Sequence, residues 1–131
     1  QFLAPGKMAY SAEKVTITGN NNILLTERGS SFGYGLVSDM TAITVMQKTG
    51  YPVIFDATHS AQVPGSEATT GGQRYMIPIL AKAAVAAGCD GLFMEIHDNP
   101  VEAKSDAATQ WPLDELKDLL KIIINVHKAV K

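Results

Sequence analysis

PVIFDATHSAQ, residues 52–62, sets the architecture expected of this chain. Its first four residues are apolar and mostly β-branched or aromatic, which predicts a short buried strand. A group of polar residues follows at once: Asp56, Thr58, His59, Ser60 and Gln62. A buried strand that ends in polar side chains before a Gly-rich loop and a helix is typical of α/β enzymes. A lone histidine is more often a surface or core residue, so the interpretation of His59 depends on repetition of the pattern.

The pattern does repeat along the chain. Apolar runs predict strands at residues 1–4, 23–25, 52–55 and 91–94. Helical spacing follows each run: a short helix capped by Ser11, then helices over 39–48, 73–87 and from Pro112 onward. Pro78 should kink the third helix or mark a late start. The loop at 63–72 is long for its place and therefore a candidate functional loop. This order predicts an α/β fold with a parallel sheet.

Each predicted strand carries polar residues at its carboxyl end, among them Glu27-Arg28, Asp56, His59 and Glu95. In a (β/α)₈ TIM barrel the active site lies at that end of the strands. A doubly wound sheet follows the same rule, but the chain has no G-x-G-x-x-G dinucleotide motif. Four βα units are half of a barrel of about 250 residues. We therefore expect residues 1–131 to be the C-terminal half of a TIM-barrel domain. A small autonomous α/β domain is the alternative.

Composition excludes several classes of function. The chain has 131 residues, 46% of them hydrophobic, and a formal net charge of −2. That charge argues against a nucleic-acid or anionic-membrane partner. No apolar run reaches the roughly 20 residues of a membrane span, and no signal-peptide pattern is present. Cys89 is the single cysteine, so no internal disulfide can form, and we expect a cytoplasmic protein.

Three residues are candidate metal ligands: His59, Glu95 and Asp106. Imidazole nitrogen and carboxylate oxygen suit a divalent ion such as Mn, Fe, Co or Zn. His59 and Glu95 end different strands, which would converge at a barrel mouth. Asp106 could equally be a solvated loop acid or a cap.

Two further residues are candidate substrate contacts. Arg28 follows the second strand, and a forked guanidinium there suits a phosphate or carboxylate substrate. A salt bridge with Glu27 or Asp56 is the alternative. Gln62 could hold a substrate oxygen or only line the loop.

Five segments together resemble the 3-deoxy-D-manno-octulosonate 8-phosphate synthase family. They are LLTERGSSFGYG (24–35), PVIFDATHSAQVPG (52–65), TTGGQRY (69–75), GCDGLFMEIHDNP (88–100) and SDAATQWPL (105–113). The resemblance covers the second half of that family's barrel. It implies condensation of phosphoenolpyruvate with arabinose 5-phosphate and water, which gives the sugar acid phosphate and inorganic phosphate. It also implies the lipopolysaccharide pathway, the bacterial cytoplasm and a homotetramer.

The resemblance also implies roles for residues. His59, Glu95 and Asp106 match the metal ligands of the family's metal-dependent branch, and His59 and Asp106 would act in catalysis. Arg28 matches a contact to the phosphoenolpyruvate phosphate, and Gln62 and His59 match substrate-pocket residues. The metal-independent branch reads Cys-Asp-Gly-Pro where this chain reads Ser105 to Ala108, which favours the metal-dependent branch.

Some features expected of that family are missing. The chain lacks the N-terminal Cys ligand and the contacts to the sugar phosphate, so we expect these residues alone to be inactive. The sister 3-deoxy-arabino-heptulosonate 7-phosphate synthases share the barrel and the metal logic and are the nearest alternative. A non-catalytic half-barrel fragment is the alternative of another class.

Overall fold

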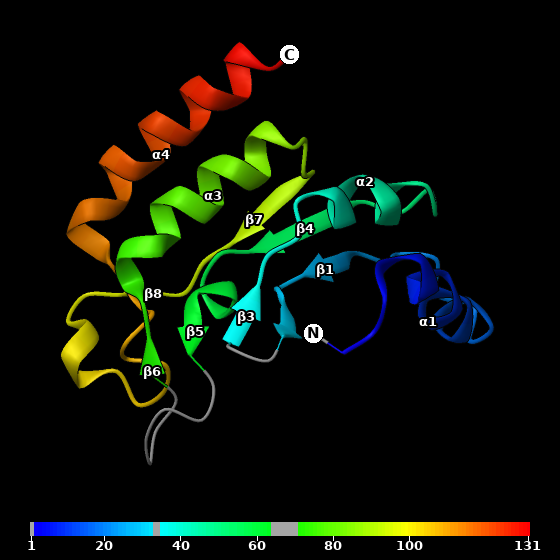
Figure 1. The fold of residues 1–131 in the computed structure, drawn as a ribbon, viewed down its shortest axis with the longest axis horizontal. Coiled ribbons are helices and arrows are strands. Elements are labelled where there is room, and N and C mark those ends of the chain that lie inside the picture. Colours follow the sequence, from blue (N-terminus) through cyan, green and yellow to red (C-terminus); the bar gives the residue numbers. More distant parts are fainter. Residues whose placement is uncertain (1, 33–34, 64–70) are drawn as a thin grey trace.

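A parallel sheet forms the centre of the molecule. The computed structural model describes residues 2–32, 35–63 and 71–131. Within these residues the sheet has three strands in the order β1 (Leu25–Glu27), β4 (Val53–Asp56) and β7 (Gly91–Phe93) (Figure 1). Glu27 pairs with Phe55, and Asp56 pairs with Phe93. The carboxyl ends of all three strands therefore lie at one edge of the sheet.

The part of the chain that the structure describes has four α-helices: α1 (Met8–Thr16), α2 (Thr41–Gln47), α3 (Ile77–Ala86) and α4 (Leu113–Ala129). Helix α2 contacts β1 and β4, and α3 contacts both β7 and α4. In Figure 1, α3 and α4 run side by side, and α1 lies at the opposite end of the molecule. None of the described helices has both the length and the apolar character that a membrane span requires.

The core lies where α2 and α3 pack against the sheet. Val53 and Phe55 of β4 are fully buried, as are Ile43 of α2 and Ile77 of α3. Ala81 and Ala84 continue the buried face of α3, and their small side chains let the helix approach the sheet closely. Packing of this kind holds β4 in place and fixes the position of the polar residues that follow it.

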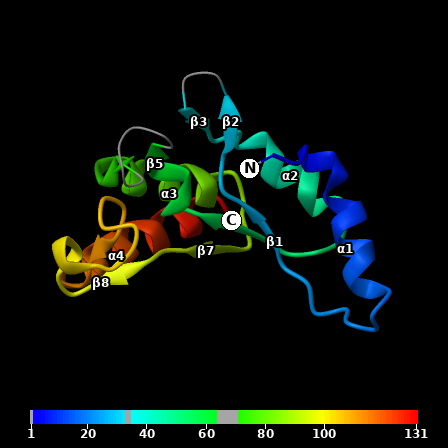
Figure 2. The ribbon, with the colours of Figure 1, turned by 90° about the horizontal axis from the view of Figure 1, so that it is seen from below.

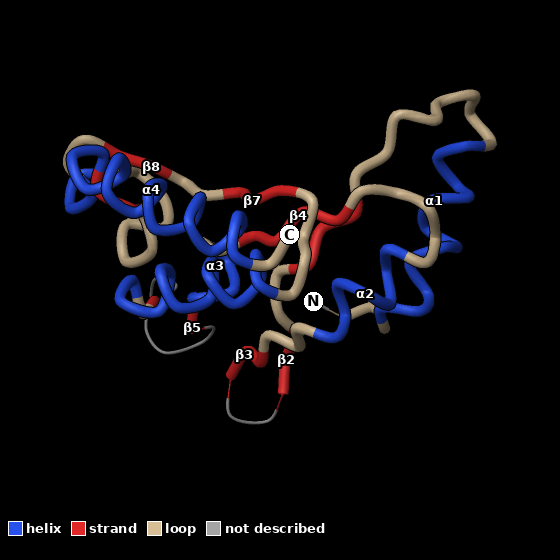
Figure 3. Tube along the Cα trace, turned by 90° about the horizontal axis from the view of Figure 1, so that it is seen from above, coloured by secondary structure: helices blue, strands red, loops and turns tan. Residues whose placement is uncertain are grey.

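Short elements extend from the carboxyl edge of the sheet. Strands β2 (Ser30–Phe32) and β3 (Gly35–Val37) form an antiparallel hairpin that projects from the body (Figures 2 and 3). Strand β5 (Gln62–Val63) pairs with β6 (Gly71–Gly72), and β8 (Ile96–His97) pairs with β9 (Trp111–Pro112). The 3₁₀ helices are η1 (Pro5–Lys7), η2 (His59–Ala61), η3 (Arg74–Met76) and η4 (Pro100–Glu102). The central part of the predicted functional loop, residues 64–70, lies outside the described residues.

Several predicted elements need correction. The predicted strand at residues 1–4 is wrong for residues 2–4, because they have no neighbouring strand to pair with among the described residues and Phe2 is exposed. The described residues therefore hold three parallel βα units where four were expected. Ser11 lies inside α1, which starts directly after η1. Pro78 marks a late helix start, as one of the two readings predicted, since a first-turn N–H needs no partner inside the helix.

Candidate metal and substrate site

Three candidate metal ligands converge at the carboxyl edge of the sheet. His59 opens η2 directly after β4, Glu95 follows β7, and Asp106 lies in the turn before β9. One donor atom from each residue lies within 4.8 Å of those of the other two. All three side chains are half-buried. The structure thus brings together the three residues that the sequence singled out.

Asp56 sets the orientation of His59. One carboxylate oxygen of Asp56 accepts the Nδ1–H of His59 at 2.7 Å, and the other accepts the backbone N–H of His59 at 2.9 Å. Because an ionised carboxylate can only accept hydrogen bonds, the ring proton must sit on Nδ1. In the neutral ring, the Nε2 atom of His59 then carries a lone pair.

That lone pair faces another acceptor. His59 Nε2 lies 3.5 Å from Glu95 Oε1, with the Asp106 carboxylate close by. Two acceptors at this distance are stable only with a cation or a proton between them. Neighbouring ligand atoms around an ion with bonds of about 2.0–2.2 Å lie roughly 3–3.5 Å apart. The separation of His59 and Glu95 therefore suits a shared divalent cation, and the donor atoms of all three residues suit one chemically.

Further hydrogen bonds hold Glu95 and Asp106 in place. Thr58 is fully buried, and its hydroxyl oxygen accepts the backbone N–H of Glu95 at 2.8 Å. The side-chain amide of Gln110 donates to Glu95 Oε2 at 2.6 Å. Asp106 has a φ of 52°, and its carbonyl oxygen accepts the N–H of Thr109 at 2.8 Å. Asp tolerates this left-handed conformation better than most residues do.

The two predicted substrate residues join the same network. The Arg28 guanidinium follows β1 and donates to Gln62 Oε1 at 2.9 Å and to the His59 carbonyl at 3.5 Å. The Gln62 amide in turn donates to Asp106 Oδ1. Arg28, Gln62 and Asp106 therefore form a chain of contacts that ends at a candidate metal ligand.

Burial raises the pKa of the carboxyl of Glu27, the residue before Arg28, above its ordinary value of 4.5. A hydrogen bond from the backbone N–H of Gly29, at 2.6 Å, opposes this rise only in part. Glu27 is therefore a desolvated carboxyl group at the carboxyl end of β1.

A second connection links the end of the predicted functional loop to the Asp106 turn. Arg74 donates to the Ala107 carbonyl at 2.5 Å. A Cβ added at Gly72 would overlap the methyl group of Thr109. Sequence reasoning assigned no role to Thr58, Arg74 or Gln110. All three fall inside the quoted motifs, but only the folded turn reveals which group each one holds.

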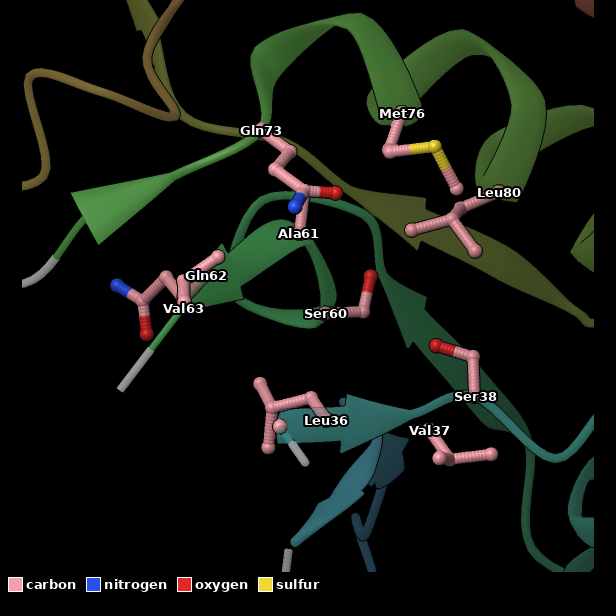
Figure 4. A pocket seen from close by; sticks show the side chains of 11 residues that line it. Leu36, Val37, Ser38, Ser60, Ala61, Gln62, Val63, Gln73, Met76 and Leu80 are labelled. Atoms are coloured by element: carbon pink, nitrogen blue, oxygen red, sulfur yellow. The ribbon is translucent and has the colours of Figure 1, made fainter. Parts of the chain in front are cut away.

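A pocket of about 300 Å³ is lined by Ser60, the neighbour of His59 in the chain, and by Gln62, which donates to Asp106 (Figure 4). Its walls come from β3, η2, β5, η3 and α3, and Leu36, Met76 and Leu80 contribute apolar side chains to them. Gln62 is the one predicted site residue that lines it. The buried hydroxyl of Ser60, also in its wall, has no hydrogen-bond partner among the described residues. The pocket is therefore adjacent to the candidate cation site and separate from it.

Comparisons with known proteins agree along the whole chain. The profile of a family described as the DAHP synthetase I family matches residues 1–131. A protein of Acidithiobacillus ferrooxidans named 2-dehydro-3-deoxyphosphooctonate aldolase is 55% identical over 133 aligned residues, which cover 100% of this chain and 47% of the relative. Proteins of the same name from Methylococcus capsulatus and Dechloromonas aromatica are each 52% identical, and 47% and 49% of their lengths are covered. The chain spans about half the length of these curated relatives.

Proposed function

Since the chain belongs to the DAHP synthetase I family, we propose that it supplies part of the active site of a 3-deoxy-D-manno-octulosonate 8-phosphate synthase. Such an enzyme condenses phosphoenolpyruvate with arabinose 5-phosphate and water. Relatives that are 50–55% identical carry the corresponding name, 2-dehydro-3-deoxyphosphooctonate aldolase. The observation that carries the proposal is the facing of His59 Nε2 and the Glu95 and Asp106 carboxylates, which suits a divalent cation.

His59, Glu95 and Asp106 would hold that cation, which can be Mn, Fe, Co or Zn. When bound, it would act as a Lewis acid that orients the sugar aldehyde or the reacting water. Asp56 keeps the ring proton on Nδ1, so that Nε2 stays available. Proposed catalytic roles fall to His59 and Asp106 because their donor atoms converge where the reacting groups would meet.

Arg28 is the proposed holder of the phosphoenolpyruvate phosphate. Its guanidinium stays charged at all working pH values and donates from a rigid fork that matches a phosphate. The contact from Arg28 to Gln62 aims that fork toward the Asp106 side of the site. Gln62, which also lines the adjacent pocket, is the proposed contact to a substrate oxygen.

The same proposal extends to the whole protein. Residues 1–131 would be part of a (β/α)₈ barrel, with the β1–β4–β7 sheet as one arc of it. The enzyme would work in lipopolysaccharide precursor synthesis in the cytoplasm, as a homotetramer. No nucleic acid or membrane partner is proposed.

A chimera tests the proposed function. Residues 1–131 replace the matching part of the Acidithiobacillus ferrooxidans relative, and release of inorganic phosphate from phosphoenolpyruvate is measured with each sugar phosphate. We expect turnover with arabinose 5-phosphate and much less with erythrose 4-phosphate. The reverse preference would favour the sister 3-deoxy-arabino-heptulosonate 7-phosphate synthase activity, to which the name of the matched family points. A folded chimera that is inactive with both sugars would overturn the proposal.

A further inference from the structure

We propose that Gln110 is a positioning residue that fixes the relative placement of Glu95 and Asp106. The inference rests on the proposed cation site and adds a residue to which no role has been given. Gln110 is buried and lies between the Asp106 turn and β9. It contacts one candidate ligand through its side chain and another through its backbone.

The side chain of Gln110 orients the Glu95 carboxylate. Its Nε2 donates to Glu95 Oε2 at 2.6 Å and also lies 3.4 Å from the Ser105 carbonyl oxygen. With Oε2 held in this way, Oε1 is the oxygen that faces His59 Nε2 at 3.5 Å. A free carboxylate could rotate about its last side-chain bond, because that torsion is soft. The amide therefore selects which oxygen points into the site.

The backbone of the same residue supports Asp106. The N–H of Gln110 donates to the Asp106 carbonyl oxygen at 2.9 Å, which helps to close the turn in which Asp106 has its φ of 52°. The next N–H, that of Trp111, donates to the Glu95 carbonyl oxygen at 2.9 Å. Adjacent residues thus tie the backbone of the Asp106 turn to the backbone that carries Glu95.

An amide is well suited to this position. It donates a hydrogen bond without carrying charge, so Glu95 keeps its full negative charge for a cation. A lysine or arginine in its place would form an ion pair with Glu95 and compete with the metal. Hydrogen-bond partners of metal ligands commonly set the orientation of those ligands.

Titration of the full chain with Co²⁺ tests the inference, with the dissociation constant and the visible d–d spectrum as readouts. Gln110→Met keeps the length of the side chain and the backbone N–H but removes the donor. We expect it to weaken Co²⁺ binding by about 10–100-fold and to change the spectrum. Gln47→Met is the matched control. It also removes a hydrogen bond from a glutamine side-chain amide to a carboxylate. That bond joins Gln47 to Asp90 Oδ2 at 3.0 Å, at the opposite end of the sheet. It should leave Co²⁺ binding unchanged.

A second variant covers a failure to fold. Gln110→Asn keeps the amide but shortens its reach by one methylene group, and it should also weaken Co²⁺ binding. If either variant is folded and binds Co²⁺ with the original affinity and spectrum, Gln110 is not a positioning residue. If the unsubstituted chain binds no Co²⁺, the proposed cation site and this inference both fail. Equal binding by the unsubstituted and substituted chains removes this inference alone.

Discussion

Glu27 shows how one buried carboxyl group makes the stability of the fold depend on pH. Burial raises its pKa above 4.5, so the folded chain holds the proton more tightly than the unfolded chain does. Between 4.5 and the raised value, the folded state binds more protons, and the free energy of unfolding therefore falls as pH rises through that window. At higher pH the cost of the buried charge remains in full.

We therefore expect Glu27→Gln to flatten this part of the stability profile and to raise stability at neutral pH. The amide oxygen can still accept the N–H of Gly29. Urea unfolding from pH 4 to pH 8 in the presence of a chelator measures the slope. Glu13→Gln, at an exposed carboxyl group of α1, is the control and should keep the original slope. Identical profiles for both variants would contradict the role given to burial.

A second prediction at this scale concerns Arg28. In the active chimera, Arg28→Ala should weaken phosphoenolpyruvate more than arabinose 5-phosphate, because the proposed phosphate contact is lost. Loss of one bidentate, partly desolvated charge contact costs on the order of 2–5 kcal/mol. Arg28→Lys should recover only part of that loss, since an ammonium cannot reproduce the fork. Steady-state kinetics with each substrate varied in turn provide the measurement. Equal losses for the two substrates would make Arg28 a structural residue.

At the scale of elements, the sequence predicted strands and helices best where the apolar pattern of the segment matches the face that is buried in the fold. The strands predicted at 52–55 and 91–94 are confirmed as β4 and β7, and the helix predicted over 73–87 is confirmed as α3, with the late start that Pro78 indicated. In each case apolar residues that carried the prediction are buried in the core or packed against it. The sequence predicted no strand at the β2–β3 hairpin, since Ser and Gly have little strand propensity and only pairing makes these residues a strand. The strand predicted at residues 1–4 is wrong for residues 2–4, which are mostly apolar but have no described partner strand.

Some features of the candidate site could likewise be predicted from the sequence, and others could not. Convergence of His59 and Glu95 followed from strand order alone, because β4 and β7 are neighbours. The roles of Gln110 and Arg74 depend on the turn around Asp106, whose left-handed φ no local pattern predicted. The sequence therefore predicts which side chains meet, whereas the contacts that orient them come from tertiary structure.

One prediction tests that turn directly. Gly72→Ala should push the Asp106 turn outward, because an added Cβ would overlap Thr109 and crowd Ala108. Overpacking of this kind costs on the order of 1–3 kcal/mol. We expect lower stability together with weaker Co²⁺ binding. Gly6→Ala is the control, since its added Cβ has one neighbour, at 4.0 Å. Unchanged Co²⁺ binding in Gly72→Ala would show that the turn adapts without moving Asp106.

At the scale of the whole molecule, both edge strands of the β1–β4–β7 sheet lack an outer neighbour among the described residues. Within the described residues, β1 and β7 each pair with one neighbour only, and the nearby Leu24 and Phe93 are exposed. Unpaired strand edges and exposed apolar side chains usually require a cover. The curated relatives are about twice as long as this chain, which leaves room for further βα units in the proposed barrel.

The last prediction follows from this open sheet. Residues 1–131 alone should bind a divalent cation but should not turn over phosphoenolpyruvate with arabinose 5-phosphate. The three candidate ligands come from this chain. A closed barrel mouth, which would hold the substrates and exclude bulk water, needs more strands than those described. Phosphate release is measured for the purified chain, for the full-length Acidithiobacillus ferrooxidans relative and for that relative cut to the matching region. We expect turnover from the full-length relative only. Steady phosphate release by residues 1–131 would mean that three βα units suffice for catalysis, and the proposed barrel would lose its main functional argument.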